Sequence, residues 1–128
     1  RSGLAEVLKA GIINDPALFE RLAGDGGRTT NDERPRSIPL GPTPSEMVGM
    51  IADAVRVKAR IVERDPHEMG DRAWLNLGHT FGHALELLST FTLRHGDAVA
   101  LGMICAAEMS ATLGYCDVDL PPGVRAAI

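Results

Sequence analysis

The chain has 128 residues, of which 45% are hydrophobic and only 4% aromatic, and its formal net charge is -4. This length supports one domain with a core of aliphatic residues and methionine, and the negative charge argues against a nucleic-acid or anionic-membrane partner. We expect no signal peptide and no membrane span, since no run reaches roughly 18 apolar residues. Two cysteines without CxxC spacing favour a reducing, cytoplasmic environment.

Two short helices are predicted at the start of the chain. The first covers residues 4–10, and the second begins at Pro16, after an Asn or Asp cap, and runs to Gly24. Glu6 and Lys9 lie three residues apart in the first helix and therefore share a face. Taken alone, this pair is most simply interpreted as a surface ion pair.

A long loop and a long helix follow. Residues 24–44 are rich in Gly, Pro and charge without an apolar period, so we expect a long flexible loop. A helix then starts at Ser45 and ends at the Asp65–Pro66 step, because proline disfavours helical geometry at the residue before it. Lys58 lies inside the apolar stripe of this helix, where it either snorkels to the edge of the core or reaches an anion in a pocket. The stripe consists of Met47, Ile51, Ala54, Val55, Ile61 and Val62.

The stretch from Arg72 to Glu86 has the most informative pattern. Read as one helix, it separates a polar face from an apolar face. The polar face holds Arg72, Asn76, His79, His83 and Glu86, and the apolar face holds Trp74, Leu77, Phe81, Leu85 and Leu88. Gly78 and Gly82 each cost helix stability of about 1 kcal/mol relative to alanine, which indicates close approach by another backbone or a ligand.

The spacing of His79 and His83 lets both imidazoles reach one metal ion. Thr80, however, stands where the HExxH motif of zinc proteases requires glutamate, so that class of site is excluded. Two histidines that are simply hydrogen-bonded on a helix remain the alternative.

A last helix is predicted from Ala98 to Leu113, capped by Asp97 and stopped by Gly114, with His95 just before its N-terminus. Its many small residues suit tight packing. No alternating run is long enough for a strand, so the predicted class is all-α. Because the chain begins without Met and residues 121–128 look like the start of another element, we expect a fragment of a longer protein.

Candidate metal ligands and cations are spread over these helices. A catalytic divalent metal such as zinc takes three ligands from His, Glu, Asp or Cys and keeps one position open. The candidates are Glu6, His67, Glu68, His79, His83 and His95. Lys9, Lys58 and Arg72 bind no metal but would neutralise an anionic substrate. Together they indicate a polyanionic small molecule as substrate.

Five blocks of the sequence resemble the 3-dehydroquinate synthase family, in that family's order. They are residues 2–9, the Lys58 helix, Glu68 with Arg72, residues 75–84 and residues 95–103. The resemblance covers part of the family's helical C-terminal domain, whereas its N-terminal dinucleotide-binding domain and its last helices have no counterpart here.

The resemblance implies a divalent metal, Zn²⁺ or Co²⁺, held by Glu6, His79 and His95. It further implies roles in substrate binding for Lys9, Lys58, Arg72, Asn76 and His83, and in catalysis for His83, Lys9 and Glu68. The implied reaction is the conversion of 3-deoxy-D-arabino-heptulosonate 7-phosphate to 3-dehydroquinate and phosphate in the shikimate pathway. It uses NAD⁺, bound by the N-terminal domain, in an enzyme expected to be a homodimer.

Three alternatives are weighed against this interpretation. Another sugar phosphate cyclase, such as 2-deoxy-scyllo-inosose synthase, shares the metal ligands and NAD, but Lys58, Arg72 and Asn76 favour a substrate with a carboxylate. Metal-dependent alcohol and glycerol dehydrogenases typically have aspartate where Glu6 stands. A non-catalytic helical metal-binding module is the alternative from a different class.

Overall fold

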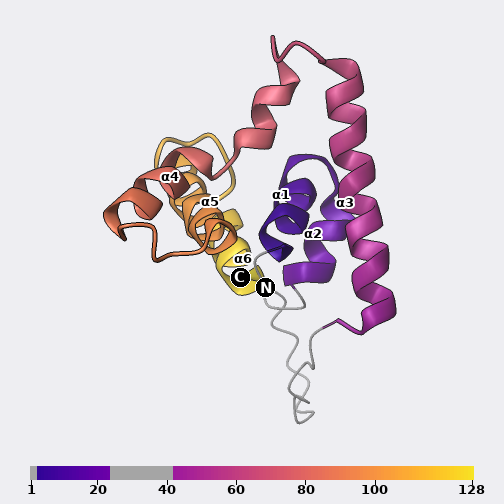
Figure 1. Ribbon diagram of the computed structural model, residues 1–128, viewed down its shortest axis with the longest axis horizontal. Helices are drawn as coiled ribbons and strands as arrows, with labels where there is room; N and C mark the ends of the chain where they lie inside the picture. Colours follow the sequence, from indigo (N-terminus) through magenta and orange to yellow (C-terminus); the bar gives the residue numbers. More distant parts are fainter. Residues whose placement is uncertain (1–2, 24–41) are drawn as a thin grey trace.

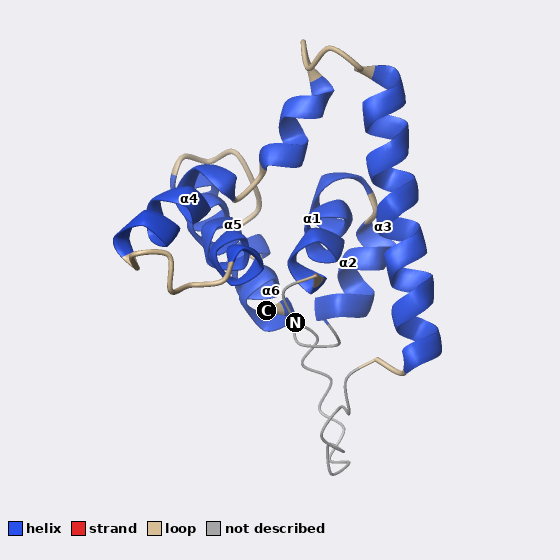
Figure 2. Ribbon diagram, in the orientation of Figure 1, coloured by secondary structure: helices blue, strands red, loops and turns tan. Residues whose placement is uncertain are grey.

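The computed structural model describes residues 3–23 and 42–128, and these residues form helices without any strand (Figures 1 and 2). The predicted all-α class is therefore confirmed. The α-helices are α1 (Leu4–Asn14), α2 (Pro16–Ala23), α3 (Pro44–Arg64), α4 (His79–Leu88), α5 (His95–Thr112) and α6 (Leu120–Ala127), and η1 (Asp71–Asn76) is a 3₁₀ helix. Most of the predicted 24–44 loop lies outside the described residues. None of the described helices has the length and apolar character required to cross a membrane.

Helix α1 lies at the centre and is shared by two hydrophobic cores (Figure 1). One core joins α1 to α5 and α6 through Ala5, Leu8, Val99, Ala100, Met103, Ala107 and Val124. The other joins α1 to α2 and α3 through Val7, Ala10, Leu18, Met50, Val57 and Ile61. A helix that packs on opposite sides must be apolar almost all round, which explains the composition of α1.

Helix α3 is defined by local signals at both ends. It starts at Pro44, one residue before the predicted start, because Thr43 is the N-cap of a capping box with Glu46. The Thr43 hydroxyl accepts from the Glu46 amide at 3.3 Å, and the Glu46 carboxylate accepts from the Thr43 amide at 2.7 Å. The helix ends at Arg64, before the Asp65–Pro66 step, as predicted.

The predicted apolar stripe of α3 is only partly correct. Val57, Met50 and Ile61 are the side chains that are buried, whereas Ile51 and Val55 are 47% and 60% exposed. The buried positions pack against α1 and α2. Ile51 and Val55 instead line a pocket beside α1, so the helix carries two adjoining apolar arcs rather than one.

The prediction of one continuous helix from Arg72 to Glu86 is wrong. The segment forms η1, breaks at Gly78, which has a φ of 83°, and resumes as α4 at His79. The two pieces therefore do not share a single apolar face, and Trp74 and Leu88 are 49% and 81% exposed. Only the left-handed backbone at Gly78, which favours glycine, allows the break.

The break coincides with close packing between α4 and α5. A Cβ on Gly102 would overlap the Gly78 carbonyl oxygen and lie 2.8 Å from the Gly82 amide nitrogen. The predicted close approach at Gly78 and Gly82 is thus confirmed, and the partner is the backbone of α5. Helix α5 starts at His95 rather than Ala98, with Arg94 at the N-cap position, and Gly114 with a φ of 74° follows its end.

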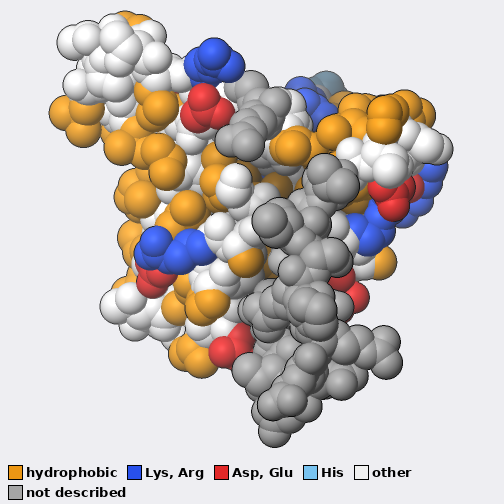
Figure 3. All heavy atoms as spheres, turned by 90° about the horizontal axis from the view of Figure 1, so that it is seen from below, with side chains coloured by type: hydrophobic (Ala, Val, Ile, Leu, Met, Phe, Trp, Pro, Cys, Tyr) orange, Lys and Arg blue, Asp and Glu red, His pale blue; other side chains and the backbone are white. Residues whose placement is uncertain are grey.

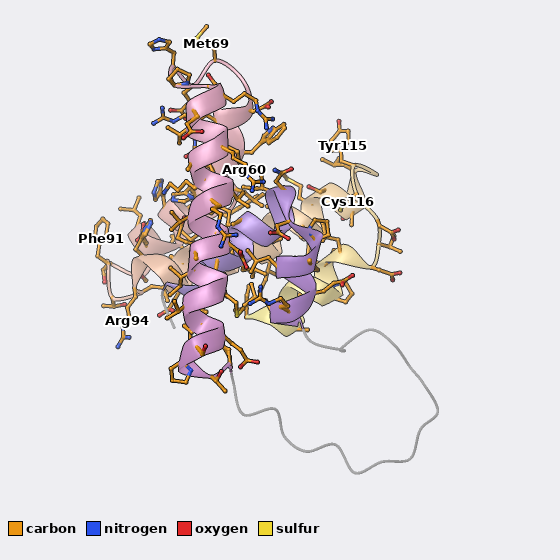
Figure 4. The ribbon with its side chains drawn as sticks, turned by 90° about the vertical axis from the view of Figure 1, so that its right-hand side faces the viewer. Arg60, Met69, Phe91, Arg94, Tyr115 and Cys116 are labelled. Carbon is orange, nitrogen blue, oxygen red and sulfur yellow. The ribbon has the colours of Figure 1, made fainter. Side chains whose placement is uncertain are left out.

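Apolar side chains also remain at the surface, as the hydrophobic atoms in Figure 3 show. They include Leu87 and Phe91 near the end of α4, which are 65% and 74% exposed. Phe91 and Arg94 belong to the α4–α5 connection at one side of the molecule (Figure 4). A chain of this size has too little interior to bury every apolar residue that its sequence contains.

The turn between α3 and η1, which carries Met69 at its tip (Figure 4), is organised by one carboxylate. Asp65 accepts hydrogen bonds from the amides of Met69 at 2.9 Å, Gly70 at 2.8 Å and Arg72 at 3.1 Å. These bonds offset the backbone strain at Glu68, which has a φ of 56°. The amides of Met69 and Arg72 hold the pKa of the Asp65 carboxyl below its ordinary value.

We expect Asp65→Ala to lower the melting temperature more than Asp71→Ala, because Asp71 makes only a 3.5 Å ion pair with Arg64. A lowered folded-state pKa gives stability that is present above the ordinary pKa and is lost as pH falls through the folded value. The difference between wild type and Asp65→Ala should therefore narrow below about pH 4. Thermal unfolding followed by circular dichroism between neutral and acid pH tests this. A difference independent of pH would contradict it.

Candidate active site

A pocket with a volume of about 430 Å³ lies between α1, α3 and the Leu75 side of η1. Most of its lining is apolar, including Ile51 and Val55 of α3. Three charged residues contribute to it: Glu6, Lys9 and Lys58. Lys58 therefore lies on a pocket wall and is exposed, so both possibilities left open by the sequence, snorkelling and contact with an anion, stay predictions. A concave apolar site with a few charged groups is typical of small-molecule binding.

Lys9 is the most deeply buried charged group among the described residues, with 2% of its surface exposed. Its Nζ lies 2.8 Å from Glu6 Oε1 and 3.2 Å from His79 Nδ1. The interpretation of Glu6 and Lys9 as a surface ion pair is therefore wrong, since the ammonium is inside the fold while the Glu6 side chain is 49% exposed. The position of α1 between two cores, which a sequence window does not reveal, buries the lysine.

These contacts shift the pKa values of both partners. Burial lowers the pKa of Lys9, and the Glu6 carboxylate offsets part of that shift. Partial burial by itself raises the pKa of Glu6, but the hydrogen bond and charge of Lys9 bring it below the ordinary value. Glu6 is thus an ionised carboxylate at neutral pH.

Three histidines gather beside this ion pair: His79 at the start of α4, His83 one turn further along α4, and His95 at the start of α5. The ring centre of His79 is 5.4 Å from that of His83 and 5.4 Å from that of His95, and the last two are 6.0 Å apart. Burial lowers the pKa of His79, and the charge of Lys9 lowers it further. The neutral imidazole is therefore favoured, and this is the form that binds a metal ion.

Glu86 joins the histidine cluster, although no role was predicted for it. His95 Nδ1 lies 3.0 Å from Glu86 Oε1, and the ligand atoms of His83, Glu86 and His95 lie within 4.8 Å of one another. The sequence signal was the place of Glu86 on the same polar face as His79 and His83. Among the described residues, the ligand atoms that lie this close together are those of His83, Glu86 and His95, whereas Glu6, His79 and His95 are not brought together in this way.

Glu68, Arg72 and Asn76 form a separate group at the turn that Asp65 organises. The Asn76 amide donates to Glu68 Oε1 at 2.9 Å, and the Arg72 guanidinium donates to the Pro66 carbonyl at 2.7 Å. Arg72 is not among the residues that line the pocket, in contrast to Lys58. The structure therefore does not place these two expected substrate-binding cations on one pocket wall. His67 is exposed in the same turn.

The sequence profile of the family described as 3-dehydroquinate synthase C-terminal matches residues 3–125. The chain belongs to this family. Among its relatives, the 3-dehydroquinate synthase of Xanthomonas oryzae pv. oryzae is 43% identical over 134 residues, which cover 100% of this chain and 34% of the relative. Those of Rhodospirillum rubrum and Xylella fastidiosa are 44% and 45% identical, covering 90% and 93% of this chain and 28% and 31% of the relatives. The chain therefore spans about a third of the length of these enzymes.

The donor groups gathered here have the chemistry of ligands for a divalent cation, and those of His83, Glu86 and His95 lie within 4.8 Å of one another. The Glu6 carboxylate and the His79 imidazole both lie within hydrogen-bonding distance of one positive charge, the Lys9 ammonium. His83 and His95 supply further imidazole nitrogens next to His79. A carboxylate with neutral imidazoles is a ligand set used by catalytic zinc sites.

Proposed function

We propose that this chain supplies the metal-binding and substrate-binding residues of a 3-dehydroquinate synthase. The reaction is the conversion of 3-deoxy-D-arabino-heptulosonate 7-phosphate to 3-dehydroquinate and phosphate, which makes the enzyme a carbon-oxygen lyase of the shikimate pathway. The observation that carries the proposal is the meeting of Glu6, Lys9 and His79 at the edge of a pocket that Lys58 also lines. The family membership of the chain supports it.

In this proposal Glu6, His79 and His95 hold a divalent metal, Zn²⁺ or Co²⁺. The structure brings the ligand atoms of His83, Glu86 and His95 closer together, but we prefer Glu6, His79 and His95 because Glu6 lines the pocket and a catalytic metal keeps an open position toward its substrate. When bound, the metal supplies Lewis acidity toward a substrate hydroxyl and NAD⁺ supplies a hydride acceptor.

The cations of this chain bind and orient the substrate. Burial lowers the pKa of Lys9, and the nearby charge of Lys58 contributes to this lowering, so an anion bound between the two side chains would offset the repulsion between them. The apolar lining strengthens such charge pairing, because the local dielectric constant is low. Lys9 and Lys58 would thus hold the phosphate and carboxylate groups of the substrate in one orientation.

His83 and the group at the turn complete the proposed site. His83 is exposed beside His79 and, with Asn76, is assigned to the phosphate end, where it can transfer a proton. Glu68 and Arg72 are assigned to substrate contact and catalysis. In this structure their polar groups bond to Asn76 and Pro66, so substrate binding would exchange these internal hydrogen bonds for substrate contacts. We further propose a cytoplasmic homodimer whose NAD⁺ site lies in another part of the parent protein.

Activity is expected only from the complete protein that contains this chain. With the heptulosonate phosphate, NAD⁺ and Co²⁺ or Zn²⁺, that protein should release phosphate and form 3-dehydroquinate, whereas the 128-residue chain alone should not. A coupled phosphate assay with purified proteins measures this, and a sugar phosphate without a carboxylate is the control substrate. Turnover of the control substrate alone would favour an inosose-type cyclase. Turnover by the isolated chain would contradict the proposal that NAD⁺ is bound by another part of the complete protein.

A further inference from the structure

Glu86 is held in a fixed place at the end of α4. Its side chain is only 15% exposed, and its backbone carbonyl accepts hydrogen bonds from the Ser89 hydroxyl at 2.8 Å and the Phe91 amide at 2.8 Å. Thr90 and Phe91, with φ values of 50° and 59°, make the tight turn that starts the connection to α5. The backbone from which the carboxylate projects is therefore fixed by the helix end.

His95 is placed against this carboxylate by the first turn of α5. Its Nδ1 lies 3.0 Å from Glu86 Oε1, whereas its side chain is otherwise 56% exposed. The packing of Gly102 against Gly78 and Gly82 fixes the distance between the two helices. The imidazole thus has one firm partner on one ring nitrogen, and its other ring nitrogen remains available.

We propose that Glu86 is the positioning residue of His95. An Nδ1–H that donates to the carboxylate leaves the lone pair on Nε2, so the hydrogen bond selects the tautomer and the ring orientation that a metal ligand requires. This inference rests on the proposed function, because it takes His95 as one of the metal ligands. It assigns to Glu86 a role distinct from that of Glu6, which binds the metal directly.

The ligand atoms of Glu86, His83 and His95 lie close enough together to hold a metal ion themselves, but the place of Glu86 relative to the pocket favours positioning over direct binding. Glu86 does not line the pocket, whereas Glu6 does. If His83, Glu86 and His95 held the metal, Glu6 and His79 would take no part in metal binding. Their shared contact would be the Lys9 ammonium. A metal held by Glu6, His79 and His95 uses the pocket-lining carboxylate and lets Glu86 keep its hydrogen bond.

The test compares Glu86→Gln, Glu86→Ala and Glu6→Gln in the complete protein, with Glu108→Gln as matched control. Glu108 lies on α5 and pairs with Arg125 at 2.8 Å, away from the histidines. Zn²⁺ affinity is measured by chelator competition, the Co²⁺ ligand field by visible absorption, and the His95 tautomer in the metal-free protein by ¹⁵N NMR.

We expect Glu86→Ala to weaken Zn²⁺ binding about 10- to 100-fold, Glu86→Gln to weaken it less, and both to keep the Co²⁺ spectrum of wild type. The His95 tautomer should become mixed in Glu86→Ala, and Glu108→Gln should change nothing. Unchanged affinity and tautomer in Glu86→Ala would overturn the proposal. So would a changed Co²⁺ spectrum and loss of metal as complete as in Glu6→Gln, since Glu86 would then be a ligand. If the metal data hold but no heptulosonate phosphate is consumed, the proposed function fails while the positioning role stands.

Discussion

Glu6→Gln in the complete protein is expected to abolish stoichiometric metal binding and to lower kcat/KM by on the order of a thousandfold, or about 4 kcal/mol. The neutral amide removes the one carboxylate among the proposed ligands and leaves two imidazoles. Metal content by elemental analysis and steady-state phosphate release measure the effect. Glu20→Gln, an exposed glutamate on α2, is the matched control and should behave as wild type.

The same substitution changes stability through Lys9. The amide oxygen still accepts a hydrogen bond from the buried ammonium, but it no longer neutralises the charge. We expect a loss of about 1 to 3 kcal/mol, less than for a fully buried pair because Glu6 is 49% exposed. Because the variant should remain folded, metal loss and unfolding can be separated. If Glu6→Gln keeps its full metal content and His83→Ala loses its metal, the metal ligands are His83, Glu86 and His95 instead.

Gly102→Ala is expected to destabilise the fold by about 3 kcal/mol, the upper end of the range for overpacking. The added methyl group would overlap the Gly78 carbonyl oxygen. A change of side-chain rotamer cannot relieve this overlap, because a Cβ atom and a backbone carbonyl are both fixed by the backbone. Relief therefore requires α4 to move away from α5, which also displaces His79 and His83 from His95. Metal affinity should fall together with the free energy of unfolding.

Gly49→Ala is the control for this prediction. Gly49 lies in α3, and the nearest atom to an added Cβ is an Arg21 guanidinium nitrogen at 3.8 Å. Alanine there should stabilise the helix by about 0.5 to 1 kcal/mol. Urea unfolding of both variants measures the two free energies. A Gly102→Ala protein as stable as wild type would contradict the backbone contact described between α4 and α5.

Local chemistry is what the sequence by itself determined. The helical class, the end of α3 at Asp65 and Pro66, and the end of α5 at Gly114 were predicted because periodicity, proline geometry and glycine caps act within a few residues. The candidate ligands and cations were also found, since their residue types restrict the chemistry that they can perform. Lys58 was recognised as unusual because a charge interrupts an apolar stripe.

Contacts between distant segments were decided by the tertiary structure alone. The break at Gly78 depends on Gly102 of another helix, so the local pattern predicted an unbroken helix. Lys9 is buried because α1 lies between two cores whose other members come from α2, α3, α5 and α6. The pairing of Glu86 with His95 needs the two helices at a fixed distance. Periodicity gives the face on which a side chain lies, but only packing decides which side chain from another helix meets it there.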